Sequence, residues 1–138
     1  MTDRLFLADH IVPGDSANHQ LTIEVTDQPR AGGAHHRYEI TGFDIFKNPA
    51  THVAPYIVRS DLETIIFQNG PIKEAGVNGI TDDALLAIVI DRLRSFQQGP
   101  YACEDNGYAL EHCKLALKNL QKRTLARIAR GVEGTHQK

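Results

Sequence analysis

The sequence has no tryptophan, one methionine and two cysteines, and aromatic residues fill only 7% of its 138 positions. Two cysteines are too few for the disulfide framework that stabilises small secreted domains. No apolar run reaches the roughly 18 residues that a membrane-spanning helix needs, and the first ten residues lack the apolar core of a signal peptide. We therefore expect a soluble, cytoplasmic protein without a membrane partner.

The net charge is only −2, because 15 Lys and Arg residues nearly balance 17 Asp and Glu residues. A balance of this kind disfavours proteins that bind long nucleic acids. The charge is unevenly distributed, however. From residue 114 onward the chain carries seven basic residues and one acidic residue, whereas the first 113 positions carry eight basic and sixteen acidic ones. The near-neutral total therefore hides a basic C-terminal segment.

Patterning in the N-terminal half predicts β structure. The first 20 residues are rich in turn formers and indicate a loop or arm. Apolar and polar residues alternate over residues 21–26 and 37–43, and β-rich runs follow at 56–58 and 64–67. Asn69-Gly70 lies between apolar runs and predicts a type I′ turn with residues 72–77 as the returning strand. We expect an antiparallel sheet of about four or five strands.

The second half has helical periodicity. Thr81 is the expected N-cap of a helix of about 16 residues, with Asp82 and Asp83 in its first turn and Gly99-Pro100 after its end. A second helix is predicted from about residue 102 to 130, ended by Gly131, with a length of roughly 40 Å. Its distal half has an apolar side without an obvious cover, which favours oligomerisation.

The predicted fold class is therefore α+β, an N-terminal antiparallel sheet followed by a C-terminal antiparallel helical hairpin with one long helix. The expected regions are residues 1–80 for the sheet and 81–138 for the hairpin, joined in one compact, oligomerising unit.

Catalytic and metal chemistry have little support in this sequence. Cys103 and Cys113 are ten residues apart on one helix, too far for a disulfide, and neither has an obvious base. His35 and His36 would point to opposite faces of a strand and could not chelate one ion. The glycines between residues 70 and 79 lack the lysine of a phosphate loop. We expect no catalytic residue, metal site or cofactor.

The most informative cluster is basic and lies at the end of the long helix: Lys122, Arg123, Arg127 and Arg130. One explanation for these basic residues is structural: cations near the C-terminal end of a helix offset its dipole. The functional one is phosphate binding, because the planar guanidinium suits phosphate oxygens. At the other end of the hairpin gather residues able to stack on a base or to read its edge, namely Phe96, Tyr101, Asn106 and Tyr108. In an antiparallel oligomer the two groups would meet and form a nucleotide site. Both explanations stay open.

Three blocks of sequence resemble a known family: residues 67–81 (FQNGPIKEAGVNGIT), 96–103 (FQQGPYAC), and the ending from Lys122 to His136. They look like the phage Thoeris anti-defence family of the first type, whose hairpin is similar to that of phage anti-CBASS sponges. The resemblance implies a non-enzymatic sponge that binds a cyclic ADP-ribose isomer, the signal of a TIR-domain enzyme, and keeps it intact. It also implies a homo-oligomer built from dimers, up to a hexamer, in the cytoplasm of the infected host.

The resemblance also implies site residues. Phe96 and Asn106 match positions that flank the base of the cyclic ADP-ribose, and Arg123 matches a residue that holds its phosphates. A second pocket for cyclic di- or trinucleotides is implied at four further positions, Arg127, Arg130, Gly131 and Thr135.

Two alternatives remain for the function, and one departure from the family bears on the ligand. The first alternative is a phosphodiesterase-type enzyme that hydrolyses the same messenger, and the second is an accessory protein that binds RNA or DNA. The departure is Glu104-Asp105, which stands where relatives are expected to carry Arg-Glu, so that ligand preference can differ.

Overall fold

The computed structural model of the chain describes residues 4–55 and 61–138. The chain divides into two compact units, Met1–Ile66 and Phe67–Lys138. The first holds the sheet and the second holds the helices, so the α+β class predicted from the sequence is confirmed.

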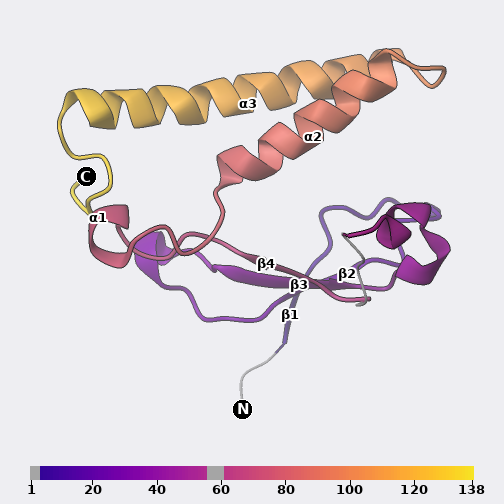
Figure 1. Cartoon of the computed structure of the whole chain (residues 1–138), viewed down its shortest axis with the longest axis horizontal. Coiled ribbons are helices and arrows are strands. Elements are labelled where there is room, and N and C mark those ends of the chain that lie inside the picture. Colours follow the sequence, from indigo (N-terminus) through magenta and orange to yellow (C-terminus); the bar gives the residue numbers. More distant parts are fainter. Residues whose placement is uncertain (1–3, 56–60) are drawn as a thin grey trace. The chain divides into compact units, whose positions relative to one another are not determined.

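The first unit is a four-stranded antiparallel sheet in which the strands follow the order of the chain (Figure 1). Its strands are β1 (Leu5–Leu7), β2 (Thr22–Val25), β3 (Arg37–Thr41) and β4 (Glu63–Ile66), and three short 3-10 helices lie in its connections, Ala31–Gly33, Ile45–Lys47 and Pro49–His52. The register opposes Ile23 to Ile40 and Tyr38 to Ile65, which places apolar side chains on one face. Val25 and Ile45 form the buried core of this unit.

Three details of the sheet differ from expectation or fall outside the described residues. The first 20 residues are not only a loop, because β1 lies within them; Leu5-Phe6-Leu7 shows no alternation, and only its pairing with β2 reveals it as an edge strand. The run at 56–58 lies outside the described residues. The two central strands lie where the alternation predicts them, and β4 lies at the β-rich run predicted for residues 64–67.

The predicted Asn69-Gly70 hairpin is wrong. Residues Ile72–Ala75 form a short helix, α1, instead of a returning strand, and Pro71 at its N-cap is compatible with a helix start. Side-chain amides replace the expected strand ladder. Asn78 accepts a hydrogen bond from the Asn69 N–H and donates one to the Asn69 carbonyl, each over 2.8 Å, while the Gln68 side chain bonds the Asn78 N–H at 2.9 Å.

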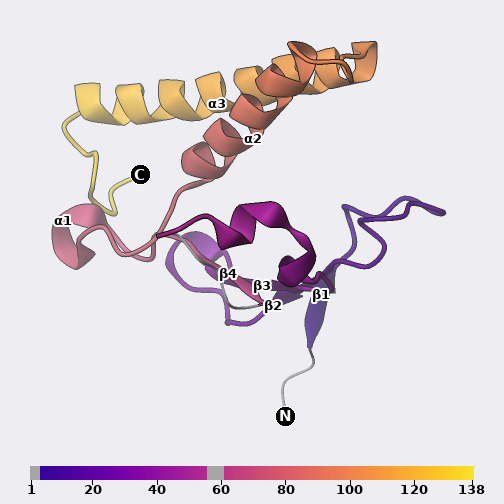
Figure 2. The same ribbon diagram turned by 45° about the vertical axis from the view of Figure 1, so that its right-hand side comes forward.

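The second unit is built on α2 (Asp82–Gln97) and α3 (Glu104–Ala129). Thr81 caps α2, accepting the Ala84 N–H over 3.1 Å, and Gly131 ends α3 with a φ of 73°, so both predicted helix limits are confirmed. Ile90 of α2 and Leu110 of α3 are buried. The helices meet near their loop and diverge away from it (Figures 1 and 2).

Because the helices diverge, the distal part of α3 has little cover from α2. Leu125 and Ile128 are 65% and 55% exposed, although Ile128 continues the apolar side of the helix. Three positions apart, the two side chains lie next to each other on the helix surface, and contiguous apolar patches mark interaction sites.

Candidate functional site

A hollow of about 430 Å³ lies at the loop end of the hairpin. It is lined by the last turns of α2 and by the loop that follows, namely Asp91, Arg92, Ser95, Phe96, Gly99, Pro100 and Tyr101. The Phe96 ring is 42% exposed, and Tyr101 is 76% exposed. Two accessible aromatic faces beside one hollow are suited to stacking on a planar base.

Arg92 adds a cation to this hollow. The carbon of its guanidinium lies 5.7 Å from the centre of the Phe96 ring, within the range of a cation–π interaction. The two residues are four positions apart on α2, so they occupy neighbouring places on one helix face. The hollow thereby combines an aromatic surface with a guanidinium, a group whose geometry suits phosphate oxygens. Sequence reasoning missed Arg92, although its spacing from Phe96 was a signal.

Asn106 lies across the loop from Phe96, in the first turn of α3. Its backbone N–H donates to the Cys103 Sγ over 3.4 Å, so Cys103 is the N-cap of this helix. Asn106 is half-buried and is not part of the lining of the hollow. The structure thus brings Phe96 and Asn106 to the same end of the hairpin.

The acidic pair beside Asn106 is partly engaged within the chain. Glu104 accepts a hydrogen bond of 2.7 Å from the Tyr108 hydroxyl one turn later, and this bond together with desolvation raises the pKa of Tyr108 above its ordinary value. Glu104 and Asp105 also lie in the first turn of α3, where carboxylates favour the helix dipole. The pair therefore stabilises the helix start next to the hollow.

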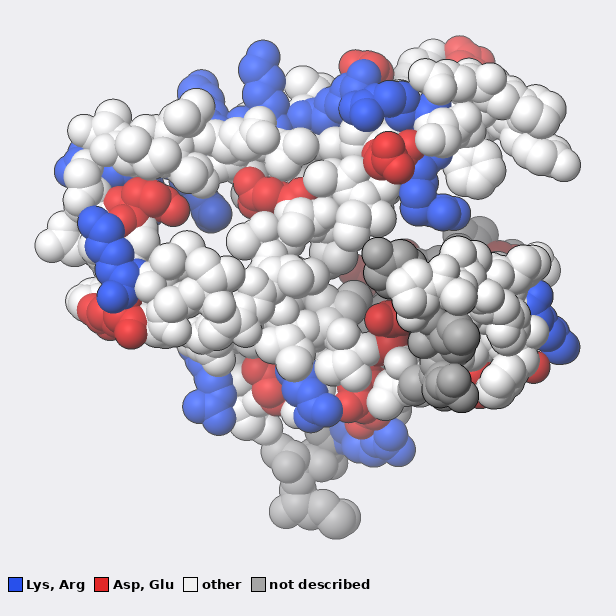
Figure 3. Space-filling model, viewed as in Figure 1, with Lys and Arg blue, Asp and Glu red and all other residues white. Residues whose placement is uncertain are grey.

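The basic residues stand along α3, away from the hollow. Lys and Arg side chains line the outer side of this helix (Figure 3). At about 1.5 Å of rise per residue, Arg123 lies roughly 25 Å along the axis from Asn106. Arg123 is exposed, and its side chain makes no hydrogen bond or ion pair within residues 4–55 and 61–138. A single chain therefore does not bring Arg123 to the Phe96 hollow.

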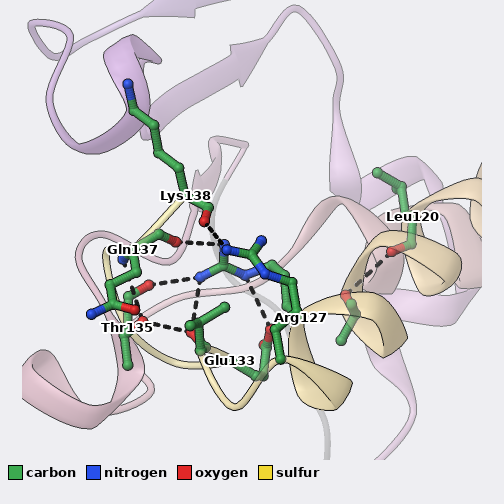
Figure 4. A network of polar contacts seen from close by, with 9 residues as sticks. Leu120, Arg127, Glu133, Thr135, Gln137 and Lys138 are labelled. Atoms are coloured by element: carbon green, nitrogen blue, oxygen red, sulfur yellow. Dashed lines mark hydrogen bonds and ion pairs between the residues drawn. The ribbon is translucent and has the colours of Figure 1, made fainter.

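Arg127 is engaged by its own chain. Its guanidinium donates to the main-chain oxygens of Gln137 at 2.7 Å and of Val132 and Thr135 at 3.0 Å each (Figure 4). The Glu133 carboxylate lies 3.5 Å from its Nε. These contacts direct the guanidinium towards residues 131–137, which we call the tail turn. Arg127 and Thr135 meet within this turn.

The tail turn is also held by α1. The Lys73 N–H donates to the Gly134 carbonyl over 3.0 Å, and His136 lies 3.1 Å from the Glu74 carboxylate. Gly131 provides the positive φ that reverses the chain after α3. Arg130 donates from Nη2 to the Lys138 oxygen over 2.5 Å and is otherwise exposed. Residues 131–135 therefore form an ordered turn, with Arg130 at its rim.

The described part of the chain contains no group of three or more His, Cys, Asp or Glu side chains placed to hold a metal ion. None of its helices combines the length and the apolar character needed to cross a membrane.

The hairpin is similar to known proteins. Residues 61–125 match the Acb2/Tad1 hairpin domain. Over 77 residues the chain is 47% identical to a protein of Bacillus phage SBSphiJ7 named Thoeris anti-defense 1. The aligned region covers 56% of this chain and 54% of the relative, so the chain spans about half the length of the curated relative it matches. The match of residues 61–125 and the phage relative confirm the resemblance to the Thoeris anti-defence family.

Proposed function

We propose that this chain is a phage anti-defence protein that sequesters the cyclic ADP-ribose isomer of the TIR-based Thoeris system without degrading it. The observation that carries the proposal is the hollow at the loop end of the hairpin, in which Phe96 and Tyr101 offer aromatic faces beside Arg92. Supporting it are the name of the phage relative and the match of residues 61–125 to the Acb2/Tad1 hairpin domain.

In this proposal the base of the messenger stacks on Phe96, and the Asn106 side chain contacts its edge. Base–aromatic stacking is worth about 1–3 kcal/mol per base, and each charge-assisted contact to a phosphate about 1.5–3 kcal/mol. A few such contacts reach nanomolar affinity only in a preorganised site. Sequestration needs such tight binding, and it needs no catalytic base.

The site is complete only in an oligomer. Arg123 lies roughly 25 Å from Asn106 along α3, so the arginine that holds the phosphates comes from a second copy of the chain. The exposed apolar residues Leu125 and Ile128 supply contact area for that copy. We propose a homo-oligomer built from dimers, acting in the cytoplasm of the infected host.

A second pocket for cyclic di- or trinucleotides is proposed at the tail turn. Arg130 lies at the rim of the tail turn, and Gly131 and Thr135 belong to the turn. Arg127 stabilises the turn by donating to its main-chain oxygens. The role of Glu104-Asp105 in this scheme is to limit how many phosphates the hollow accepts, since both carboxylates lie beside Asn106.

The test of sequestration is recovery of the ligand. The protein is incubated with the cyclic ADP-ribose isomer, freed of excess ligand, heated to unfold it, and the released material is identified by mass spectrometry. We expect the intact messenger in stoichiometric amount. Recovery of cleaved product, or turnover of excess ligand, would identify the chain as a phosphodiesterase-type enzyme instead. Light scattering of the complex checks the assembly, and a monomer that binds the ligand fully would contradict the shared site.

A further inference from the structure

The side chain of Gln97 bridges the two ends of the hairpin loop. Its Nε2 donates to the Cys103 carbonyl over 2.9 Å, and its Oε1 accepts the Cys103 N–H over 3.0 Å. Both polar atoms of one amide therefore bind both main-chain groups of one residue. Gln97 is half-buried, and it is the last residue of α2.

The same bridge is packed against the first turn of α3. The Cys103 carbonyl also accepts the Gly107 N–H over 3.1 Å, and a Cβ added at Gly107 would lie 3.2 Å from the Gln97 Nε2. Cys103 in turn caps α3 through the bond from the Asn106 N–H. Gln97 directly follows Phe96 in sequence. Its side chain is joined through Cys103 to α3, the helix that carries Asn106.

We infer that Gln97 is a positioning residue for the messenger site, and this inference rests on the proposed function. Gln97 is not among the residues that line the hollow, yet it closes the loop that contributes Gly99, Pro100 and Tyr101 to it. Without the bridge, the loop loses its only side-chain tie between α2 and Cys103 among the described hydrogen bonds. Phe96, Tyr101 and Asn106 then sample many relative positions, and binding has to order them.

The decisive variant is Gln97→Glu, because its bridge can be switched by a proton. An ionised carboxylate accepts the Cys103 N–H but has no donor for the Cys103 carbonyl, so one bond is replaced by repulsion between oxygens. The protonated acid has the shape of the amide and donates its O–H to that carbonyl. The matched control is Gln98→Glu, which adds the same charge at the next, exposed position. Both variants and the parent share the neighbouring Cys103, Glu104 and Asp105, and their affinities are compared with one another at the same pH.

Affinity for the cyclic ADP-ribose isomer is measured by calorimetry at about pH 7.5 and about pH 5, near which a glutamic acid facing a carbonyl becomes protonated. We expect Gln97→Glu to bind about tenfold more weakly than the parent at the higher pH, and to recover at least about half of this deficit on a logarithmic scale at the lower pH. Gln98→Glu should match the parent at both values. Gln97→Met, which cannot form the bridge, should stay weak at both.

Parent-like binding by Gln97→Glu at the higher pH would overturn the inference, and so would a deficit that does not respond to pH. A parent chain that binds no cyclic ADP-ribose isomer overturns the proposed function, and the site role of Gln97 with it. Hydrogen exchange at the Cys103 amide distinguishes the two failures. In Gln97→Met, which offers no acceptor to the Cys103 N–H, this amide should exchange faster than in the parent at either pH, whether or not ligand binds.

Discussion

Arg127 holds Thr135 through a hydrogen bond of 3.0 Å from its Nη2 to the Thr135 carbonyl. Both residues were assigned to a ligand pocket by resemblance, and the structure joins them to each other. Most of the donors of the guanidinium point at main-chain oxygens of the tail turn or at Glu133. Arg127, which the family resemblance assigns to a ligand pocket, therefore makes structural contacts in this chain.

The first prediction concerns stability at this contact. Arg127→Ala leaves the carbonyl of the half-buried Thr135 without this donor and removes one donor each from the Val132 and Gln137 carbonyls. We expect it to lower the free energy of unfolding of the helical unit by about 1–3 kcal/mol. Arg127→Lys should restore little of this loss, because a lysine ammonium lacks the planar fork that reaches three oxygens. Urea denaturation followed by helical circular dichroism measures both variants.

The control for Arg127 is Arg123→Ala on the same helix. The side chain of Arg123 is exposed and free of hydrogen bonds to the described residues, so its removal should change the free energy of unfolding by less than about 0.5 kcal/mol. Equal effects of the two substitutions would mean that the tail contacts of Arg127 contribute nothing to stability.

The second prediction concerns the aromatic hollow. Phe96→Ala removes the stacking surface and should weaken binding of the cyclic ADP-ribose isomer by at least about tenfold, the equivalent of about 1.4 kcal/mol. Phe46→Ala is the matched control, since Phe46 is 67% exposed in the sheet unit. Calorimetry on both variants, with their circular dichroism spectra, separates lost contact from lost fold. If Phe96→Ala bound like the parent, the base would have to lie elsewhere.

The third prediction separates the two proposed pockets. Arg123→Ala should weaken binding of the cyclic ADP-ribose isomer by at least about tenfold and leave cyclic di- and trinucleotides unaffected. Arg130→Ala should show the opposite pattern. Calorimetry of the parent and both variants against a panel of these ligands measures which affinity each substitution lowers. A loss of both ligands in either variant would indicate one shared pocket.

The fourth prediction concerns the pH dependence of the sheet unit. Desolvation acts to raise the pKa of the Asp27 carboxyl. The backbone N–H groups of His36 and Arg37 donate to this carboxyl over 2.9–3.1 Å and act in the opposite direction. The net result is a pKa of Asp27 below its ordinary value. A lowered pKa in the folded state means that Asp27 stabilises the fold above its unfolded pKa of about 3.9 and that this contribution is lost as the pH falls through the folded value.

We therefore expect Asp27→Asn to lower stability at neutral pH and to reduce the loss of stability between about pH 5 and about pH 2. Asp9→Asn, at an exposed position, is the control and should follow the parent. Urea denaturation across this pH range is the measurement. An acid dependence that Asp27→Asn leaves unchanged would show that other carboxylates are responsible.

Local patterns in the sequence were sufficient for the helices and the central strands. The Thr81 cap, the Gly131 reversal and the alternation in β2 and β3 all depend on residues close in sequence, and each was predicted at its observed place. The same reasoning failed at Asn69-Gly70, because a turn dipeptide does not report that the Gln68 and Asn78 amides will replace a strand ladder. It also missed β1, whose strand character depends on its partner β2.

The sequence by itself determined the α+β class, the helix ends and the residue types that suit a nucleotide, since these follow from periodicity, capping and side-chain chemistry. Only the tertiary structure decided how those residues are used. It joins Gln97 to Cys103 across a loop, turns Arg127 towards its own tail, and leaves Arg123 exposed on α3. These outcomes depend on contacts between residues that become neighbours only after the chain has folded, so no local sequence pattern predicts them.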